Sequence, residues 1–243
     1  STPPQMLLTP PETLQAIIVG RVMRANLKNV RWVVVDEVHE LVDNKRGAQL
    51  SLALERMRKI AKFQTIGLSA TIGSPERAAK FLVGKNRDCE IIDISIAKDA
   101  EIEVLYPEKS EGDDALANAL YTYAPVAARL RTIKSIVDSH KSVIIFTNTR
   151  SIAETLASRF KVWGIDGMGV HHGSLSKPTR LTMERDFKDG KIKGIISTSS
   201  LELGIDVGSV DAVVQYGSPR EVTRTLQRIG RSGHRIGRKA EGY

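Results

Sequence analysis

The sequence predicts an α/β protein in which helices cover both faces of parallel sheets. Strand-like and helix-like segments alternate between residues 142 and 229, which is the order of elements that a parallel sheet requires. Residues 30–35 form a β-branched run that ends abruptly in two acids, as a buried parallel strand does at its carboxyl end. A hydrophobic content of 41% over 243 residues can supply the core of one large domain or of two smaller ones.

The first half of the chain is expected to hold strands at residues 30–35 and 65–68, with a helix at 47–62 between them. The helix shows its buried stripe in Leu50, Leu54 and Met57, which recur three or four residues apart. After about residue 88 the pattern loosens into short extended pieces and a polar stretch. We therefore expect a first domain at 1–97, a linker at 98–118 and a second domain at 119–243.

The second half shows the alternation most clearly. It opens with a helical segment at 115–140 that we expect to be disturbed at Pro125, because proline removes a backbone donor. The expected elements after it are strands at 142–146, 167–171, 193–197 and 210–216, with helices at 152–162, 177–188 and 221–229.

The charge balance favours a polyanionic partner. Lys and Arg number 36 against 28 Asp and Glu, which gives a net charge of +8 and a pI near 9.6. Nucleic acid or an acidic membrane surface would suit this excess, and a basic solvated surface is the plain alternative. No apolar run approaches the roughly 18 residues that span a bilayer, and Cys89 is the only cysteine, which excludes internal disulfides. We expect a soluble cytoplasmic protein without a membrane partner.

The segment Asp36-Glu37-Val38-His39 is the richest cluster of chemical groups. Two adjacent acids at the carboxyl end of a strand can hold Mg²⁺ through the first and orient an attacking water through the second. Nucleotide hydrolysis requires both actions. Taken alone, two acids after a strand are equally consistent with a loop or a helix cap.

Hydroxyl groups follow three other expected strands. Ser69-Ala70-Thr71 could hydrogen-bond the acids and His39, although a capped helix start before Pro75 explains it equally well. The segments 146–150 and 197–206 carry hydroxyls and backbone amides that could contact phosphates without reading bases. Each of these signals is weak by itself.

Arginines gather in the segment 227–235. A guanidinium is always charged and donates several hydrogen bonds in one plane, so it suits the charge of a transferring phosphoryl group. A basic patch on a solvated helix end is the competing interpretation. His171 and His172 are adjacent on an extended segment and should point to opposite sides, so we do not expect them to bind a metal.

The order of these segments resembles that of superfamily 2 helicases. Motifs II to VI of that family are similar to Asp36 to His39, Ser69 to Thr71, Ile145 to Arg150, Thr198 to Asp206 and Gln227 to Arg231, and Thr9-Pro10 with Glu12 resembles motif Ib. Lys45-Arg46-Gly47 and the segment 171–175 further resemble the large helicase-related (Lhr-type) DExH-box family. The resemblance covers nearly the whole chain and implies two RecA-like domains of the P-loop NTPase type that bind ATP and Mg²⁺ and move along a single strand.

The resemblance also implies roles for individual residues. Asp36 would bind Mg²⁺, Glu37 would polarise the attacking water at the same metal site, and Arg231 would act as the arginine finger. The nucleotide would further be contacted by Gly204, Asp206, Gln227, Arg228, His234 and Arg235. Nucleic acid would be contacted by Thr9, Pro10, Thr147, Asn148, Arg150 and Thr198. Coupling of the two events would fall to His39, Ser69 and Thr71.

Two departures from the family pattern affect these expectations. The position three residues after Arg231, where many relatives have a second arginine, holds His234, so that either His234 or Arg235 could act there. The sequence contains no Gly-x-x-x-x-Gly-Lys-Ser/Thr loop, whose amides and lysine cradle the phosphates. We therefore expect a fragment of an ATP-dependent helicase that hydrolyses little ATP by itself.

The partner that the resemblance implies is single-stranded or partly duplex nucleic acid, with DNA favoured over RNA. Backbone contacts alone cannot distinguish the two. The missing phosphate loop keeps one alternative open, a non-catalytic nucleic-acid-binding module built on paired RecA-like domains.

Overall fold

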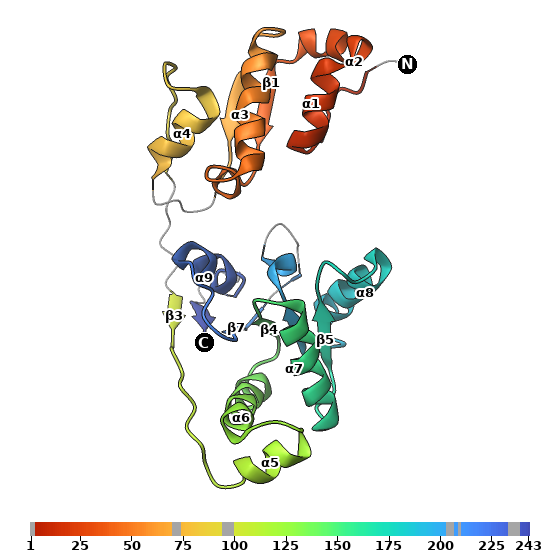
Figure 1. The fold of residues 1–243 in the computed structure, drawn as a ribbon, viewed down its shortest axis with the longest axis vertical. Helices are drawn as coiled ribbons and strands as arrows, with labels where there is room; N and C mark the ends of the chain where they lie inside the picture. The colour runs from red at the N-terminus through yellow and green to blue at the C-terminus, as the bar shows by residue number, and fades with distance from the viewer. Residues whose placement is uncertain (1–2, 70–73, 94–99, 203–206, 209, 233–238) are drawn as a thin grey trace. The chain divides into compact units, whose positions relative to one another are not determined.

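The computed structural model describes residues 3–69, 74–93, 100–202, 207–208, 210–232 and 239–243. The chain divides into two compact units, residues 1–96 and 97–243 (Figure 1). Both units are built from parallel strands and helices, which confirms the predicted α/β class. Within the described part of the chain, no helix is both long enough and apolar enough to cross a membrane.

The first unit carries a two-stranded parallel sheet. Its strands are β1 (Trp32–Val35) and β2 (Gln64–Gly67), in a register that places Val35 opposite Gly67. Both strands therefore end at the same edge. Four α-helices and two short 3-10 turns complete the described part of this unit: α1 (Pro11–Val19), α2 (Arg21–Asn26), η1 (Leu27–Asn29), η2 (Val38–Glu40), α3 (Lys45–Arg58) and α4 (Pro75–Val83).

The start of helix α3, which follows the acid pair in the sequence, is fixed by two local features. Asn44 caps the helix, since its side-chain oxygen accepts a hydrogen bond of 3.0 Å from the Gly47 amide. A Cβ at Gly47 would lie 1.7 Å from the Leu41 carbonyl oxygen, so only glycine allows the loop to pass this close. Leu50, Leu54 and Met57 then point into the core, as the predicted stripe requires.

The second unit is built on six parallel strands in the order β3-β8-β7-β4-β6-β5. The predicted strands correspond to β4 (Val143–Phe146), β5 (Met168–His171), β6 (Gly194–Ser197) and β7 (Ala212–Gln215). Two short strands, β3 (Ala100–Ile102) and β8 (Ala240–Gly242), extend the sheet at one edge. Residues 98–118, where we expected a linker, thus contribute β3 and a helix to this unit.

Helices cover both faces of the six-stranded sheet. On one face α6 (Ala124–Ser139) and α7 (Arg150–Val162) pack against Val143, Ile145 and Val214. On the other face, α8 (Lys177–Lys188) packs near Ile144 and Phe146, and α9 (Val222–Ile229) contacts β7 and β8. A short η3 (Ser199–Leu201) follows β6.

The helical segment predicted at 115–140 is two helices, α5 (Asp113–Ala119) and α6, with Pro125 in the first turn of α6. Proline is tolerated there because that backbone position needs no donor. An ion pair ties the two helices together, since Arg131 Nε and Nη2 donate to the Asp113 carboxylate over 3.0 and 3.2 Å. The Arg131 hydrogen bonds, with those from Ser110, lower the pKa of Asp113 to about 2.

Replacing Asp113 by asparagine is expected to lower the melting temperature at pH 7. Because the pKa of Asp113 is depressed below its ordinary 3.8, the stabilisation is complete above that pH and disappears as pH falls toward about 2. Thermal unfolding followed by circular dichroism should therefore show a gap between the two proteins that closes over this range. Asp114→Asn is the control, because Asp114 pairs only with Lys109 at the surface among the described residues. A gap that is constant from pH 7 to 2 would contradict the prediction.

Candidate functional site

The acid pair lies at the carboxyl edge of the sheet of the first unit. Asp36 follows β1 directly and is exposed, and Glu37 has φ 49° and ψ 48°, in the left-handed region. The Glu37 amide donates to Asp36 Oδ1 over 2.9 Å, and the Val38 amide donates to the Leu68 carbonyl over 3.0 Å. A left-handed backbone at a residue with a side chain costs on the order of 1–3 kcal/mol and is often found at functional sites. The two hydrogen bonds hold this backbone conformation of Glu37 in place.

His39 connects the acids to the chain that follows β2. Its Nδ1 lies 3.1 Å from Ser69 Oγ, and its Nε2 lies 3.6 Å from a carboxylate oxygen of Glu37 and of Glu40. The His39 side chain is only 5% exposed. The structure therefore brings together His39, Ser69 and Glu37 from the coupling and catalytic sets, while Thr71 lies outside the described residues.

Thr9 and Pro10 lie at the start of α1, where Pro10 occupies the N-cap position and Thr9 Oγ1 donates to its carbonyl over 3.3 Å. This end of α1 is held beside the start of α3, because Arg46 Nε donates to the Glu12 carboxylate over 2.7 Å. The Arg46 hydrogen bond lowers the pKa of Glu12. The Thr9-Pro10 segment is thus attached to the helix that follows the acids.

The carboxyl ends of β4, β6 and β7 carry the predicted nucleic-acid contacts of the second unit. The chain leaves β4 toward β6 and β5 on one side, and β7 lies on the other, so that the topology reverses beside β4. Ligands of open parallel sheets bind at such points. Asn148 connects the loops that follow β4 and β7 at this point, because its Nδ2 donates to the Ser218 carbonyl over 2.8 Å.

Thr147 differs from the other predicted contacts because its side chain is buried. Its hydroxyl donates to the Thr149 carbonyl over 3.0 Å and so holds its own loop. Asn148 and Arg150 are exposed, Thr198 is half-buried, and Arg150 Nη1 donates to Ser174 Oγ over 3.1 Å. Of the predicted contacts at this edge, these three side chains are therefore accessible to a ligand.

The two histidines at the end of β5 point to different helices, as their adjacency predicts. His171 Nε2 lies 2.8 Å from Glu184 on α8, and His172 Nε2 lies 2.6 Å from Glu154 on α7. The His171 side chain lines a pocket of about 380 Å³ that also has Lys177 and Arg180 on its walls. Across the described ranges, no three His, Cys, Asp or Glu side chains gather as a metal-binding group.

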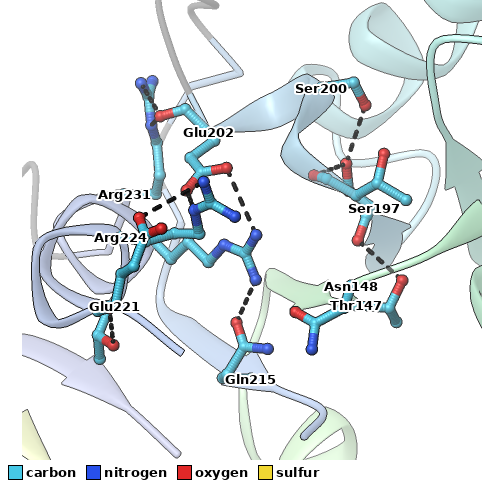
Figure 2. A network of polar contacts seen from close by, with 12 residues as sticks. Thr147, Asn148, Ser197, Ser200, Glu202, Gln215, Glu221, Arg224 and Arg231 are labelled. Carbon is cyan, nitrogen blue, oxygen red and sulfur yellow. Dashed lines mark hydrogen bonds and ion pairs between the residues drawn. The ribbon is translucent and has the colours of Figure 1, made fainter. Parts of the chain in front are cut away.

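Two arginines of α9 and Arg231, which follows that helix, converge on Glu202, the residue after η3 (Figure 2). Glu202 Oε1 lies 3.2 Å from Arg224 Nε, and Oε2 lies 3.4 Å from Arg228 Nη2. The Glu202 carbonyl accepts hydrogen bonds from Arg231 Nε and Nη2 over 3.2 and 2.7 Å. Glu202 is 5% exposed, so this carboxylate is almost fully buried among cations.

Arg228 is enclosed by the fold. It is 2% exposed, its Nη1 donates to Gln215 Oε1 over 2.6 Å, and its guanidinium carbon lies 5.1 Å from the centre of the Phe146 ring. Such contacts compensate a buried charge. Of the arginines predicted to meet a nucleotide, Arg228 therefore packs inward, whereas Arg231 is half-buried at the end of the helix.

The structure does not describe four of the nucleotide residues predicted from the sequence: Gly204, Asp206, His234 and Arg235. Gln227 is described and half-buried on α9. Sequence reasoning missed Glu202, Gln215 and Arg224. The only sequence signal was the position of Glu202 inside the motif at 198–206.

Comparisons with known proteins agree with this arrangement. The profile of the DEAD/DEAH box helicase family matches residues 1–79, and that of the helicase conserved C-terminal domain matches residues 128–237. The ATP-dependent helicase Lhr-Core of Methanocaldococcus jannaschii is 46% identical over 99% of this chain, which spans 28% of that protein. The chain thus covers less than a third of this relative's length.

Two solved structures show the same fold. Mycobacterium smegmatis helicase Lhr, bound to single-stranded DNA and AMP-PNP, matches with a TM-score of 0.79 and 37% identity over 96% of this chain and 30% of that one. Saccharomyces cerevisiae Dbp5, bound to RNA and ADP BeF3, matches with a TM-score of 0.63 and 25% identity over 96% of this chain and 57% of that one. The two profiles, these matches and the ordered motifs lead to one conclusion: this chain belongs to the superfamily 2 helicases, is similar to their Lhr-type members, and carries RecA-like domain structure in both of its units.

Proposed function

We propose that this chain is the part of an ATP-dependent helicase that orients the attacking water, supplies the arginine finger and holds the strand. The observation that carries the proposal is that polar side chains gather at the carboxyl edges of the sheets in both units. Asp36 and Glu37 leave the sheet of the first unit at its carboxyl edge, and the Glu202–arginine cluster lies beside the strand ends of the second. The resemblance to helicases over 99% of the chain supports it.

The proposed roles of the two acids follow from their chemistry. Mg²⁺ in nucleotide sites commonly takes one or two carboxylates and completes its shell with waters and phosphate oxygens. The exposed carboxylate of Asp36 fits this requirement, and Glu37 fits the orientation of the attacking water. When bound, the ion would neutralise charge on the phosphates. His39 and Ser69, joined by their 3.1 Å contact, would transmit changes at Glu37 to the chain after β2, together with Thr71.

Arg231 is proposed to stabilise the charge of the phosphoryl group, aided by Gln227, Gly204, Asp206 and either His234 or Arg235. The inward packing of Arg228 favours a supporting role for that residue. Because no phosphate-binding loop occurs in the sequence, we propose that the 243-residue chain alone hydrolyses little or no ATP and that a longer protein supplies this loop.

The test of the motor is ATP hydrolysis by that longer protein with and without nucleic acid. Hydrolysis that single strands stimulate, together with strand displacement that requires ATP, would support the proposal. The alternative is a non-catalytic module that only binds nucleic acid. A longer protein that binds strands but hydrolyses no ATP under any condition would establish the alternative and refute the motor.

The strand itself is proposed to lie along the carboxyl edges, in contact with Thr9, Pro10, Asn148, Arg150 and Thr198. Lys177 and Arg180 line the same pocket as His171, the last residue of β5, and add positive charge there. DNA is the favoured strand, because the 37% identical Lhr structure holds single-stranded DNA, whereas RNA is held by the more distant Dbp5.

Replacing Arg150 by alanine is expected to weaken binding of single strands about three- to tenfold at moderate salt. Each phosphate contact adds roughly 0.7 to the slope of log affinity against log salt for single strands, so the slope should fall by about that amount. Fluorescence anisotropy with a labelled oligothymidylate at several salt concentrations measures both quantities. Arg159→Ala, in the last turn of the same helix, is the control. Equal slopes for wild type and Arg150→Ala would exclude the contact.

A further inference from the structure

Glu202 is a buried acid to which none of the roles above assigns a function. It follows η3 directly and precedes residues 203–206, which contain Gly204 and Asp206. Its carboxylate and its carbonyl both bind arginines of the 222–231 segment. We propose that Glu202 is a positioning residue that sets the orientation of Arg231, an inference that rests on the proposed role of Arg231 as the finger.

The side chain of Glu202 fixes where α9 lies. Arg224 and Arg228 are four residues apart and therefore share one face of the helix, so that a single carboxylate can hold both. The two contacts measure 3.2 and 3.4 Å, and they use different oxygens of the carboxylate. Because Glu202 is 5% exposed, water screens these contacts little. Rotation or sliding of α9 would break them.

The backbone of Glu202 then fixes the guanidinium itself. Arg231 follows directly after Gly230, which ends the helix, so its side chain is oriented only in part by helical geometry. Two nitrogens of its guanidinium, Nε and Nη2, donate to the Glu202 carbonyl over 3.2 and 2.7 Å. One residue therefore controls both the position of the helix end and the plane of the guanidinium that follows it.

This arrangement gives a direct chemical reason for a kinetic effect. A guanidinium that stabilises a transferring phosphoryl group acts only when it is held at the correct place, and a displacement of about 1 Å can lower a rate about 100-fold. Loss of the Glu202 charge would release Arg224 and Arg228 and so displace the carbonyl from Arg231. An ion pair that merely stabilises the fold would have no such effect on turnover once the protein is folded.

The first test compares Glu202→Gln with Glu221→Gln in the full-length ATP-hydrolysing protein. Glu221 is the matched control, because its exposed carboxylate also lies 3.5 Å from Arg224, whereas Glu202 contacts Arg228 and Arg231 as well. We expect Glu202→Gln to lower kcat about 100-fold, with the KM for ATP changed less than about threefold. Glu221→Gln should stay within about twofold of wild type. Equal kcat for both variants would overturn the proposal.

A double-mutant cycle with Arg231→Ala separates this inference from the proposed function. If Glu202 acts through Arg231, adding Glu202→Gln to Arg231→Ala should lower kcat no further. Multiplicative losses would show that Glu202 acts by another route and would overturn the positioning role. If Arg231→Ala itself kept normal turnover, the finger assignment would fail, whatever Glu202→Gln did.

A third comparison tests whether Glu202→Gln lowers turnover only because it unfolds the second unit. The double variant Glu202→Gln/Arg228→Met removes the buried acid and a buried cation together, which restores charge balance in the core. We expect it to recover the melting temperature but not the turnover. Turnover that recovers together with stability would assign Glu202 a structural role alone.

The 243-residue chain offers a readout that does not require ATP. The Nε–H of Arg231, which donates to the Glu202 carbonyl, should give a separate, slowly exchanging signal in nitrogen-15 NMR spectra. Glu202→Gln is expected to shift and broaden this signal, and Glu221→Gln to leave it in place. An unchanged Arg231 signal in Glu202→Gln would contradict the inference even if the ATPase result agreed with it.

Discussion

Replacing Arg231 by alanine is expected to lower kcat for strand-stimulated ATP hydrolysis about 10³- to 10⁵-fold in the full-length protein. Arginine fingers contribute factors of this size, equivalent to about 4–7 kcal/mol of the activation barrier. The KM for ATP should change far less, because the guanidinium matters most when charge develops on the transferring phosphoryl group. Steady-state hydrolysis at saturating oligonucleotide measures both parameters.

Two further variants test whether the loss of turnover is specific to the guanidinium of Arg231. Arg231→Lys keeps the positive charge but loses the planar fork of donors, so we expect it to recover little of the lost turnover. Arg185→Ala removes one positive charge from the exposed surface of α8 in the same unit, where the Arg185 Nε lies 4.0 Å from an Asp186 carboxylate oxygen. It should leave kcat near wild type. Normal turnover by Arg231→Ala would remove the arginine finger from the proposed function.

The sequence predicted those elements whose pattern is local. Strands β4 and β6 are buried along their whole length and have Val, Ile or Phe at most of their positions, and α8 has the bounds expected from its helical pattern. The short strands β3 and β8 were not predicted. Each is three residues long, and β3 is exposed along its whole length, so no periodicity marks it. Pairing across 140 residues of chain, Ala100 with Ala240, creates these strands.

The residues of the candidate site also fall into those that the sequence predicts and those that it does not. Adjacent acids after a strand must leave at its carboxyl edge, so Asp36 and Glu37 were predictable, and so was the divergence of His171 and His172. The inward direction of Arg228 was not, because it depends on Phe146 and on Glu202, which lies 26 residues away in the chain. Helical spacing told which residues share a face of α9 but not which face the sheet covers. The Glu202 cluster therefore emerged only from the folded chain.

Replacing Glu37 by glutamine is expected to lower kcat about 10²- to 10⁴-fold, the range over which a positioned acid–base group contributes to catalysis. Glutamine has nearly the same size and can adopt the same backbone, so the change removes the charge of the carboxylate and little else. ATP binding should persist, because the proposed Mg²⁺ carboxylate of Asp36 is untouched. The protein should then accumulate as a complex of unhydrolysed ATP and nucleic acid, which filter binding with labelled ATP would detect.

Glu40 supplies the matched control for this prediction. Its carboxylate, like that of Glu37, lies 3.6 Å from His39 Nε2, and Glu40 is the last residue of η2, the turn for which Glu37 is the N-cap. Glu40→Gln therefore removes an equal charge at an equal distance from the histidine. If the environment of His39 alone mattered, both variants would lose activity equally. A selective loss in Glu37→Gln assigns the water-orienting role to Glu37, because only Glu37 adjoins Asp36 and has the left-handed backbone that turns the chain away from the strand.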